Sequence, residues 1–195
     1  IGSLLPLALL IIAYLRGNLG FNPVETVLQR TGQTAVILLL LSLTCTPIHN
    51  LFKLPSIKRL RKPLGLYATL YAALHFTAFA IWDYGLNLRL IWVEIREKPF
   101  ILLGLVSLII LLILAATSLR AIQRKLGKAW IWLHRLVYLA AALTILHYLL
   151  AVKGDLFSLQ GEYTLPLLAA GVLILLFLLR LPAIYQPLRR LFGRD

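Results

Sequence analysis

The stretch AWIWLHRLVYLAAALTILHYLL, residues 129–150, decides the fold of this chain. It is long and apolar enough to cross a bilayer, for which a helix needs about 20 residues. It nevertheless carries His134 near its start and His147 near its end. Polar side chains at membrane depth are costly and usually mark a cofactor, ion or proton site. The two histidines are about 20 Å apart along a helix axis, so each needs a partner on another helix.

The composition of the whole chain supports a membrane location. Hydrophobic residues make up 61% of the sequence and charged residues only 14%, against a charged share of about 25% in soluble domains. The net charge of +13 could indicate nucleic-acid binding. However, the cations fall mainly in short segments between apolar runs, which is the pattern that sets membrane topology. We therefore expect an integral membrane protein.

Six apolar runs predict an all-α membrane protein built as a six-helix transmembrane bundle. Only helices and closed barrels satisfy the backbone in lipid, and no segment alternates as barrel strands do. The length leaves no room for a soluble second domain, so residues 1–195 form a single expected domain. Because the chain has no methionine, we expect the first helix to be truncated at its N-terminus. No small-residue cleavage site follows this run, so we do not expect a signal peptide. The runs are residues 4–15, 34–48, 64–82, 100–118, 129–150 and 164–181.

The charges of the connections predict the orientation. Six of the seven acids lie on one side of the bilayer and most cations on the other, so the positive-inside rule makes both termini cytoplasmic. The third and fifth helices then run parallel. Pro47 and Pro63 are expected at helix ends, and no internal repeat is apparent. The cytoplasmic cations are Lys53, Lys58, Arg59, Arg61, Lys62, Arg120, Arg124, Lys125, Lys128, Arg180, Arg189, Arg190 and Arg194. The acids opposite are Glu25, Asp83, Glu94, Glu97, Asp155 and Glu162.

A third histidine, His75, lies in the run LGLYATLYAALHFTAFAIW, residues 64–82. Imidazole is a common axial ligand of haem iron. We therefore expect the third and fifth helices to hold b-type haem in the bilayer and to pass electrons across it. Counted from the helix starts, the depth of His75 is about midway between those of His134 and His147, so depth leaves the pairing open. His49, at the cytoplasmic end of the second helix, fits an interfacial position but could also reach a cytoplasm-side haem with His134.

Two sets of cations have alternative interpretations. Arg135 lies inside the apolar run and either extends its side chain to the interface or binds a haem propionate. A basic cluster flanks Gly127 and is mostly explained by topology, although it could also contact a flavin phosphate. The cluster consists of Arg120, Arg124, Lys125 and Lys128.

Three stretches resemble a known family: GFNPVETVLQRTGQTA at residues 20–35, RKPLGLYATLYAALHFTAF at 61–79, and TSLRAIQRKLGKAWIWLHRLVYLAAALTILHYLLAVK at 117–153. The resemblance is to the MsrQ family, the haem-binding membrane subunits of bacterial periplasmic methionine sulfoxide reductase systems. That family lies within the ferric-reductase-like transmembrane superfamily. The resemblance implies a multi-pass protein of the bacterial inner membrane that takes electrons from quinol or a cytoplasmic flavin reductase. It would deliver them through b haem to a periplasmic molybdenum-cofactor enzyme.

The resemblance also implies a set of site residues. The family's haem histidines match His75, His134 and His147, and FMN binding is associated with the family. In the wider superfamily the third and fifth helices each carry two haem histidines. Here the region of Arg61 and Lys62 takes the cytoplasmic position on the third helix. The resemblance therefore pairs His75 with His147 and leaves His134 with His49, with water or unpaired, giving one or two haems.

Two other functions stay open. One is a ferric or cupric reductase that acts on metal ions directly. The other is a small transporter or proton channel with His75 and His147 as a relay. It would need acids or broken helices at the midplane, and all seven acids lie outside the apolar runs. The sequence contains no triad, nucleotide loop or acid pair. An oxidoreductase component that is catalytic only with its partner is therefore the expectation.

Overall fold

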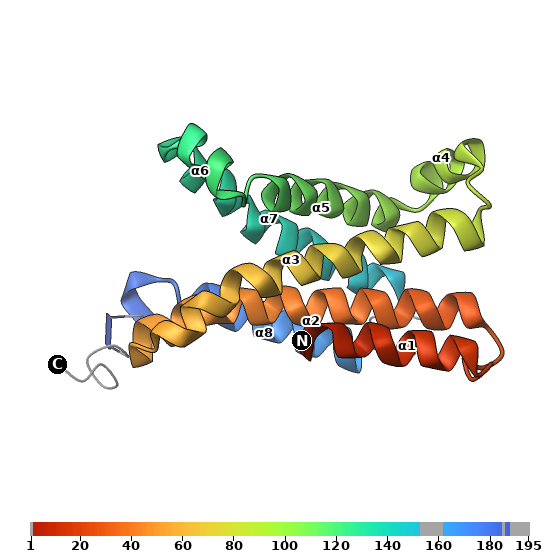
Figure 1. The fold of residues 1–195 in the computed structure, drawn as a ribbon, viewed down its shortest axis with the longest axis horizontal. Coiled ribbons are helices and arrows are strands. Elements are labelled where there is room, and N and C mark those ends of the chain that lie inside the picture. The colour runs from red at the N-terminus through yellow and green to blue at the C-terminus, as the bar shows by residue number, and fades with distance from the viewer. Residues whose placement is uncertain (1, 153–161, 185, 188–195) are drawn as a thin grey trace.

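The computed structural model describes residues 2–152, 162–184 and 186–187, and the secondary structure in these residues is helical (Figure 1). Asp155, Arg189, Arg190 and Arg194, counted above among the topology charges, lie outside the described residues. The described elements are η1 (Gly2–Leu4), α1 (Leu5–Leu15), α2 (Pro23–Phe52), α3 (Pro55–Ala78), η2 (Phe79–Asp83), α4 (Leu88–Glu97), α5 (Pro99–Ala116), α6 (Arg120–Leu126), α7 (Lys128–Ala151) and α8 (Thr164–Leu178).

The helices confirm a multi-pass helical membrane protein. Among the described residues, four helical segments are long and apolar enough to cross a bilayer, namely α2, α3 with η2, α5 and α7. The segment of η1 with α1, and α8, are apolar but shorter. Each of the six apolar runs therefore corresponds to a helix. Six complete spans and the cytoplasmic position of both termini remain predictions.

The central helices form two antiparallel hairpins. Helix α2 packs along α3, and α5 packs along α7, while α1 and α8 lie beside α2 (Figure 1). Helices α3 and α7 run in the same direction. The core at the junction is tightly closed, since Leu43, Ala68, Tyr71 and Ala140 are each at most 1% exposed. Small residues at such a junction let helix backbones approach closely, which is how helices associate in lipid.

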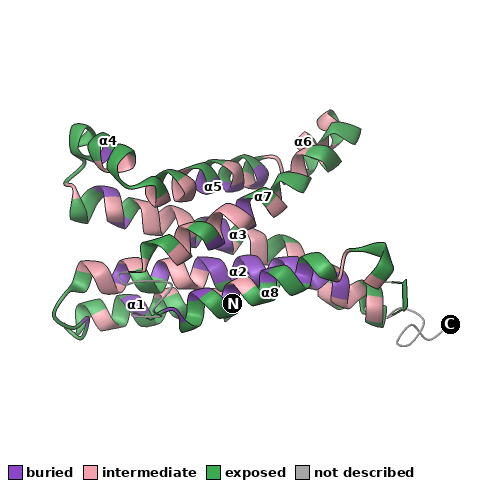
Figure 2. Ribbon diagram, turned by 180° about the vertical axis from the view of Figure 1, so that it is seen from behind, coloured by how far each residue is buried: buried purple, intermediate pink, exposed green. Residues whose placement is uncertain are grey.

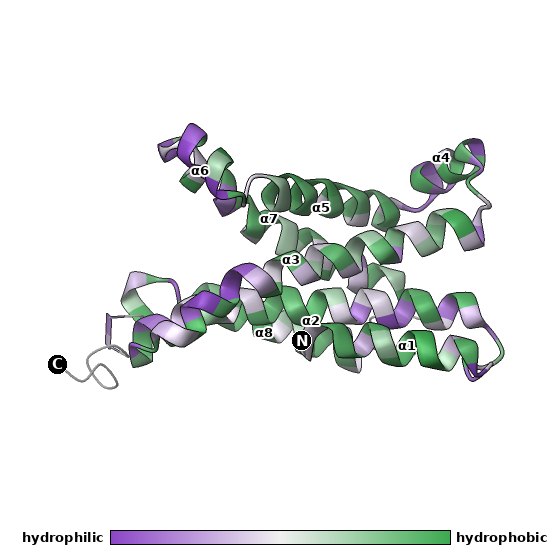
Figure 3. Ribbon diagram, in the orientation of Figure 1, coloured by the Kyte–Doolittle hydropathy of each residue, from purple (hydrophilic) through white to green (hydrophobic). Residues whose placement is uncertain are grey.

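The outer faces of the bundle are apolar. Large side chains on the outer faces of α5, α7 and α8 stay exposed, for example Ile109, Leu139 and Leu168 at 48%, 49% and 62% (Figure 2). In water such a surface would be an aggregation liability, whereas in a bilayer it faces lipid. Hydrophilic residues gather on α4, on α6 and on the first half of α3 (Figure 3). We call the end that carries α6 and the start of α3 the basic end.

Two short helices occupy connections that the sequence analysis treats as loops. Helix α4 begins where the Asn87 side chain accepts a hydrogen bond from the Leu90 backbone N–H at 3.2 Å, a standard N-cap. At its end Glu94 and Lys98 form an ion pair. The Lys98 ammonium lowers the pKa of the Glu94 carboxyl, and the same contact raises the pKa of Lys98. Helix α6 ends at Gly127, which has a φ of 52°.

Helix α3 begins nine residues earlier than the apolar run predicts. Pro55 is at its first turn, where the missing N–H costs nothing. Lys62 therefore lies inside the helix, and its Nζ donates to the carbonyl of Ser118 beyond the end of α5 at 2.7 Å. Pro63 was expected at a helix end but lies within α3. The apolar run marks only the part of α3 that meets other apolar surfaces, and basic side chains continue the same helix.

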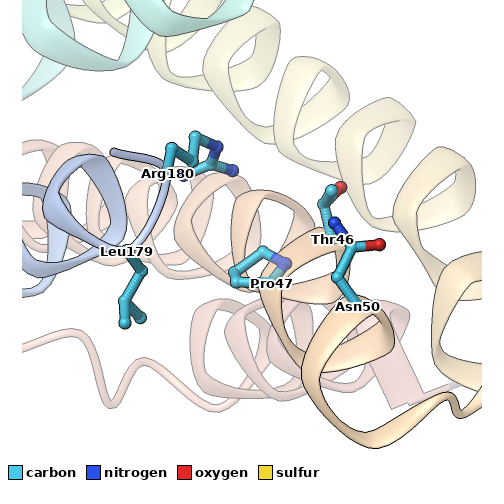
Figure 4. Close-up of a pocket in the computed structure, with 5 residues that line it drawn as sticks. All are labelled: Thr46, Pro47, Asn50, Leu179 and Arg180. Atoms are coloured by element: carbon cyan, nitrogen blue, oxygen red, sulfur yellow. The ribbon is translucent and has the colours of Figure 1, made fainter. Parts of the chain in front are cut away.

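Pro47 was also expected at a helix end and lies inside α2. Proline has no N–H, so the carbonyl of Leu43, four residues earlier, loses its helical donor. The Arg180 guanidinium replaces that donor: Nη2 donates to the Leu43 carbonyl at 2.8 Å and Nη1 to the Leu176 carbonyl at 2.6 Å. Arg180 lines a cavity of about 250 Å³ together with Thr46, Pro47, Asn50 and Leu179 (Figure 4). The contact allows α2 to continue through the proline.

Replacing Arg180 by leucine should expose the dependence of α2 on this contact. A lost hydrogen bond from a charged donor costs about 1.5–3 kcal/mol, and the cost should fall by about 1 kcal/mol in a Pro47→Ala background, because residue 47 then donates to Leu43. The four proteins are compared by equilibrium unfolding in detergent micelles. An equal loss in both backgrounds would contradict a role for Arg180 as the donor that replaces the proline N–H.

Candidate metal centre

The rings of His75 and His147 lie side by side between the two hairpins. Their centroids are 6.1 Å apart and their planes are nearly perpendicular, at 82°. His75 is 20 residues beyond the start of α3 and His147 is 19 residues beyond the start of α7. Because both helices run in the same direction, this similar count places the histidines at similar depth. The early start of α3 therefore removes the ambiguity that the predicted boundaries left.

Each of the two imidazoles is anchored to the other helix of its own hairpin. His75 Nδ1 is 2.9 Å from the Leu28 carbonyl on α2, and His147 Nδ1 is 2.7 Å from the Phe100 carbonyl on α5. A carbonyl only accepts, so Nδ1 must carry the proton and donate it. Each ring is then the tautomer whose Nε2 holds the lone pair. Metal-binding histidines show this arrangement, with the second nitrogen donating to a carbonyl or carboxylate.

The separation of the rings suits two ligands of one metal. A metal–imidazole bond is about 2 Å long and the ring centre lies roughly 1 Å behind the ligating nitrogen, so two imidazoles on opposite sides of one metal have centres about 6 Å apart. The observed 6.1 Å agrees with this value. Both side chains are half-buried, and the Phe100 ring lies 5.9 Å from that of His147. His75 and His147 could therefore hold a haem iron through their Nε2 atoms, and the haem would supply one-electron redox chemistry.

His134 and His49 have different surroundings. The His134 ring stacks on Trp130 with centroids 4.0 Å apart, and its Nδ1 is 3.2 Å from the Trp130 carbonyl. Trp130 in turn donates from Nε1 to the Thr117 carbonyl at 3.0 Å. His49 Nδ1 lies 3.1 Å from the Leu54 carbonyl. Within the described ranges no group of three or more His, Cys, Asp or Glu side chains is arranged to hold an ion. A ligand role for His134 stays a prediction.

The cations named as candidate cofactor contacts lie on the outside of the basic end. The Arg135 guanidinium is 4.1 Å from the ring centre of Trp132, which is 68% exposed. This contact fits a side chain that extends to the membrane interface, and the propionate contact stays a prediction. The cluster around Gly127 is exposed as well. Its four cations are Arg120, Arg124, Lys125 and Lys128.

The residues that anchor the imidazoles were missed at the sequence level. Leu28 and Phe100 contribute only backbone carbonyls, which leave no trace in side-chain composition. A numerical signal nevertheless exists: 47 residues separate each histidine from its acceptor. Gly32 lies four residues after Leu28 and directly beside the His75 ring. Gly104 lies four residues after Phe100 and directly beside the His147 ring. No internal repeat is apparent in the sequence because this correspondence involves only a few positions.

The described helices form a multi-pass helical membrane protein in which two imidazoles lie side by side between two hairpins. Residues 31–145, more than half of the 195, match the family described as Ferric reductase like transmembrane component. The chain belongs to this family. The matched region includes His75, His134 and both glycines, and it ends two residues before His147.

Proposed function

We propose that this chain is a b-haem electron-transfer subunit of the bacterial inner membrane, with His75 and His147 as the axial ligands of one haem. The observation that carries the proposal is the adjacent pair of imidazoles, 6.1 Å apart, whose Nδ1 atoms both donate to backbone carbonyls. Family membership independently points to membrane electron transfer. A haem held by two imidazoles supplies one-electron redox chemistry.

The protein's part is to fix the two ligands. The hydrogen bonds to Leu28 and Phe100 restrain ring rotation and keep each Nε2 available, and they raise the basicity of the ligating nitrogen. The rings lie near the ends of α3 and α7 that are remote from the basic end. If the basic end is cytoplasmic, as the positive-inside rule predicts, this haem lies toward the periplasm. An electron acceptor on that side is then within easier reach than one in the cytoplasm.

The close resemblance of residues 20–35, 61–79 and 117–153 to the MsrQ family supports a specific acceptor and donor. We propose a periplasmic molybdenum-cofactor methionine sulfoxide reductase as the acceptor. Electrons would come from quinol or from a cytoplasmic flavin reductase at the basic end. The exposed cations around Gly127 offer contacts for the phosphate of FMN. His134, on the same side, is the candidate ligand of a second haem.

Replacing either axial histidine should remove the low-spin haem. We expect His75→Ala and His147→Ala each to lose the bis-imidazole absorption and electron paramagnetic resonance (EPR) signals, because each substitution removes one of the two imidazole ligands. His49→Ala is the comparison variant and should keep the signal of the haem held by His75 and His147, because His49 lies in the last turn of α2 at the basic end and its ring contacts the Leu54 carbonyl. Iron and flavin content per polypeptide, with a redox titration, completes the measurement. A full wild-type spectrum in His75→Ala or His147→Ala would refute the assignment.

The family description favours one alternative, a ferric or cupric reductase. The two functions differ in what the purified subunit does alone. We expect the dithionite-reduced protein to be reoxidised by its periplasmic partner with methionine sulfoxide and to react at least tenfold more slowly with chelated ferric or cupric ions. Stopped-flow absorption of the haem follows both reactions. Fast reoxidation by the chelated metals, without any partner, would favour the direct metal reductase.

A further inference from the structure

The two glycines beside the imidazoles repeat one local arrangement. Gly32 lies four residues after Leu28 on α2, and Gly104 lies four residues after Phe100 on α5. In a helix the Cα–Cβ bonds tilt toward the N-terminus, so the side chain of residue i+4 covers the carbonyl of residue i. A glycine at i+4 leaves that carbonyl uncovered. This is the carbonyl to which the histidine of the same hairpin donates.

The space that each glycine leaves is filled by the ring itself. A Cβ on Gly104 would lie 2.8 Å from Nδ1, 3.0 Å from Cε1 and 3.2 Å from Cγ of His147. A Cβ on Gly32 would lie 3.1 Å from Nδ1 and 3.3 Å from Cε1 of His75. Contacts under 3.0 Å between carbon and a ring atom do not occur, so His147 would have to move. His75 would need to shift by only a few tenths of an ångström.

We infer that Gly32 and Gly104 are positioning residues that set the place and plane of the two haem-ligating imidazoles; this inference rests on the proposed function. Each glycine admits one edge of the ring against the helix and exposes the carbonyl that orients it. We call each glycine with the carbonyl four residues before it a seat: Gly32 with Leu28, and Gly104 with Phe100. The planes of the two rings in these seats are at 82° to each other. The relative angle of the ligand planes shapes the EPR spectrum of a bis-imidazole iron, and outer-shell hydrogen bonds tune its potential. The two seats should therefore affect the EPR spectrum and the reduction potential of the haem as well as the amount of haem bound.

Alanine substitutions test the seats in a graded series. Loss of an outer-shell contact typically weakens metal binding by about 10–100-fold, so we expect Gly104→Ala to reduce haem affinity about tenfold or more. Gly32→Ala should keep more haem but change its EPR spectrum and midpoint potential. Gly171→Ala is the matched control, because it lies in apolar helix α8 and a Cβ there meets nothing within 4 Å. Haem content, EPR and redox titration are measured on full-length protein in detergent.

The outcomes separate this inference from the proposed function. If wild-type protein holds no haem that depends on His75 and His147, the proposed function fails. If it does, and both Gly104→Ala and Gly32→Ala retain wild-type affinity, EPR spectrum and potential, the seats are refuted while the haem site stands. Should Gly104→Ala fail to fold, Gly32→Ala decides through its spectrum: a change from wild type, absent in Gly171→Ala, supports the seats, and an unchanged spectrum refutes them.

Discussion

Two backbone carbonyls, those of Leu28 and Phe100, fix the geometry on which the candidate site depends. Carbonyls inside a transmembrane helix already accept a helical hydrogen bond, and only their second lone pair is available to a side chain. The two rings are half-buried between the hairpins, and a hydrogen bond from an imidazole N–H to such a carbonyl is stronger there than in water. Each hairpin thus holds its histidine through a hydrogen bond between its own two helices. The geometry of the candidate site follows from packing within each hairpin and from the contact between them.

At Leu28 and Phe100 the residue four positions later is a glycine, so no side chain stands between the carbonyl and the imidazole ring. This explains why the two glycines matter more than their size suggests. Gly32 and Gly104 have ordinary helical backbones, so their conformational freedom is not what the fold uses. Their role depends instead on the missing Cβ, which leaves the carbonyl four residues earlier accessible and leaves space for the imidazole ring. Gly171, which faces open space on α8, shows that a glycine in this chain need not have such a role.

The sequence predicts the helical membrane architecture well, because apolar runs report burial in lipid directly. It also selects His75 and His147, since polar groups at that depth require a reason. It misplaces helix boundaries where polar residues continue a helix, as for Arg61 and Lys62 in α3, and where a proline is accommodated, as Pro47 is by Arg180. These features depend on partners distant in the chain. The choice of His147 over His134 as the neighbour of His75 depends on the same boundary, so local patterns could not make it.

The basic end is built differently from the end with the paired imidazoles. Where a second ligand on α3 would be expected, Lys62 donates to the Ser118 carbonyl beyond α5, and Trp130 donates to the neighbouring Thr117 carbonyl. Both side chains thus donate to backbone carbonyls just beyond the C-terminal end of α5. His134 lies about 20 Å along α7 from His147, too far to belong to the same centre. Under the proposed function, an electron that enters at the basic end must therefore use another redox group there. A bound flavin or a second haem would fit, because His134 and exposed cations lie at this end.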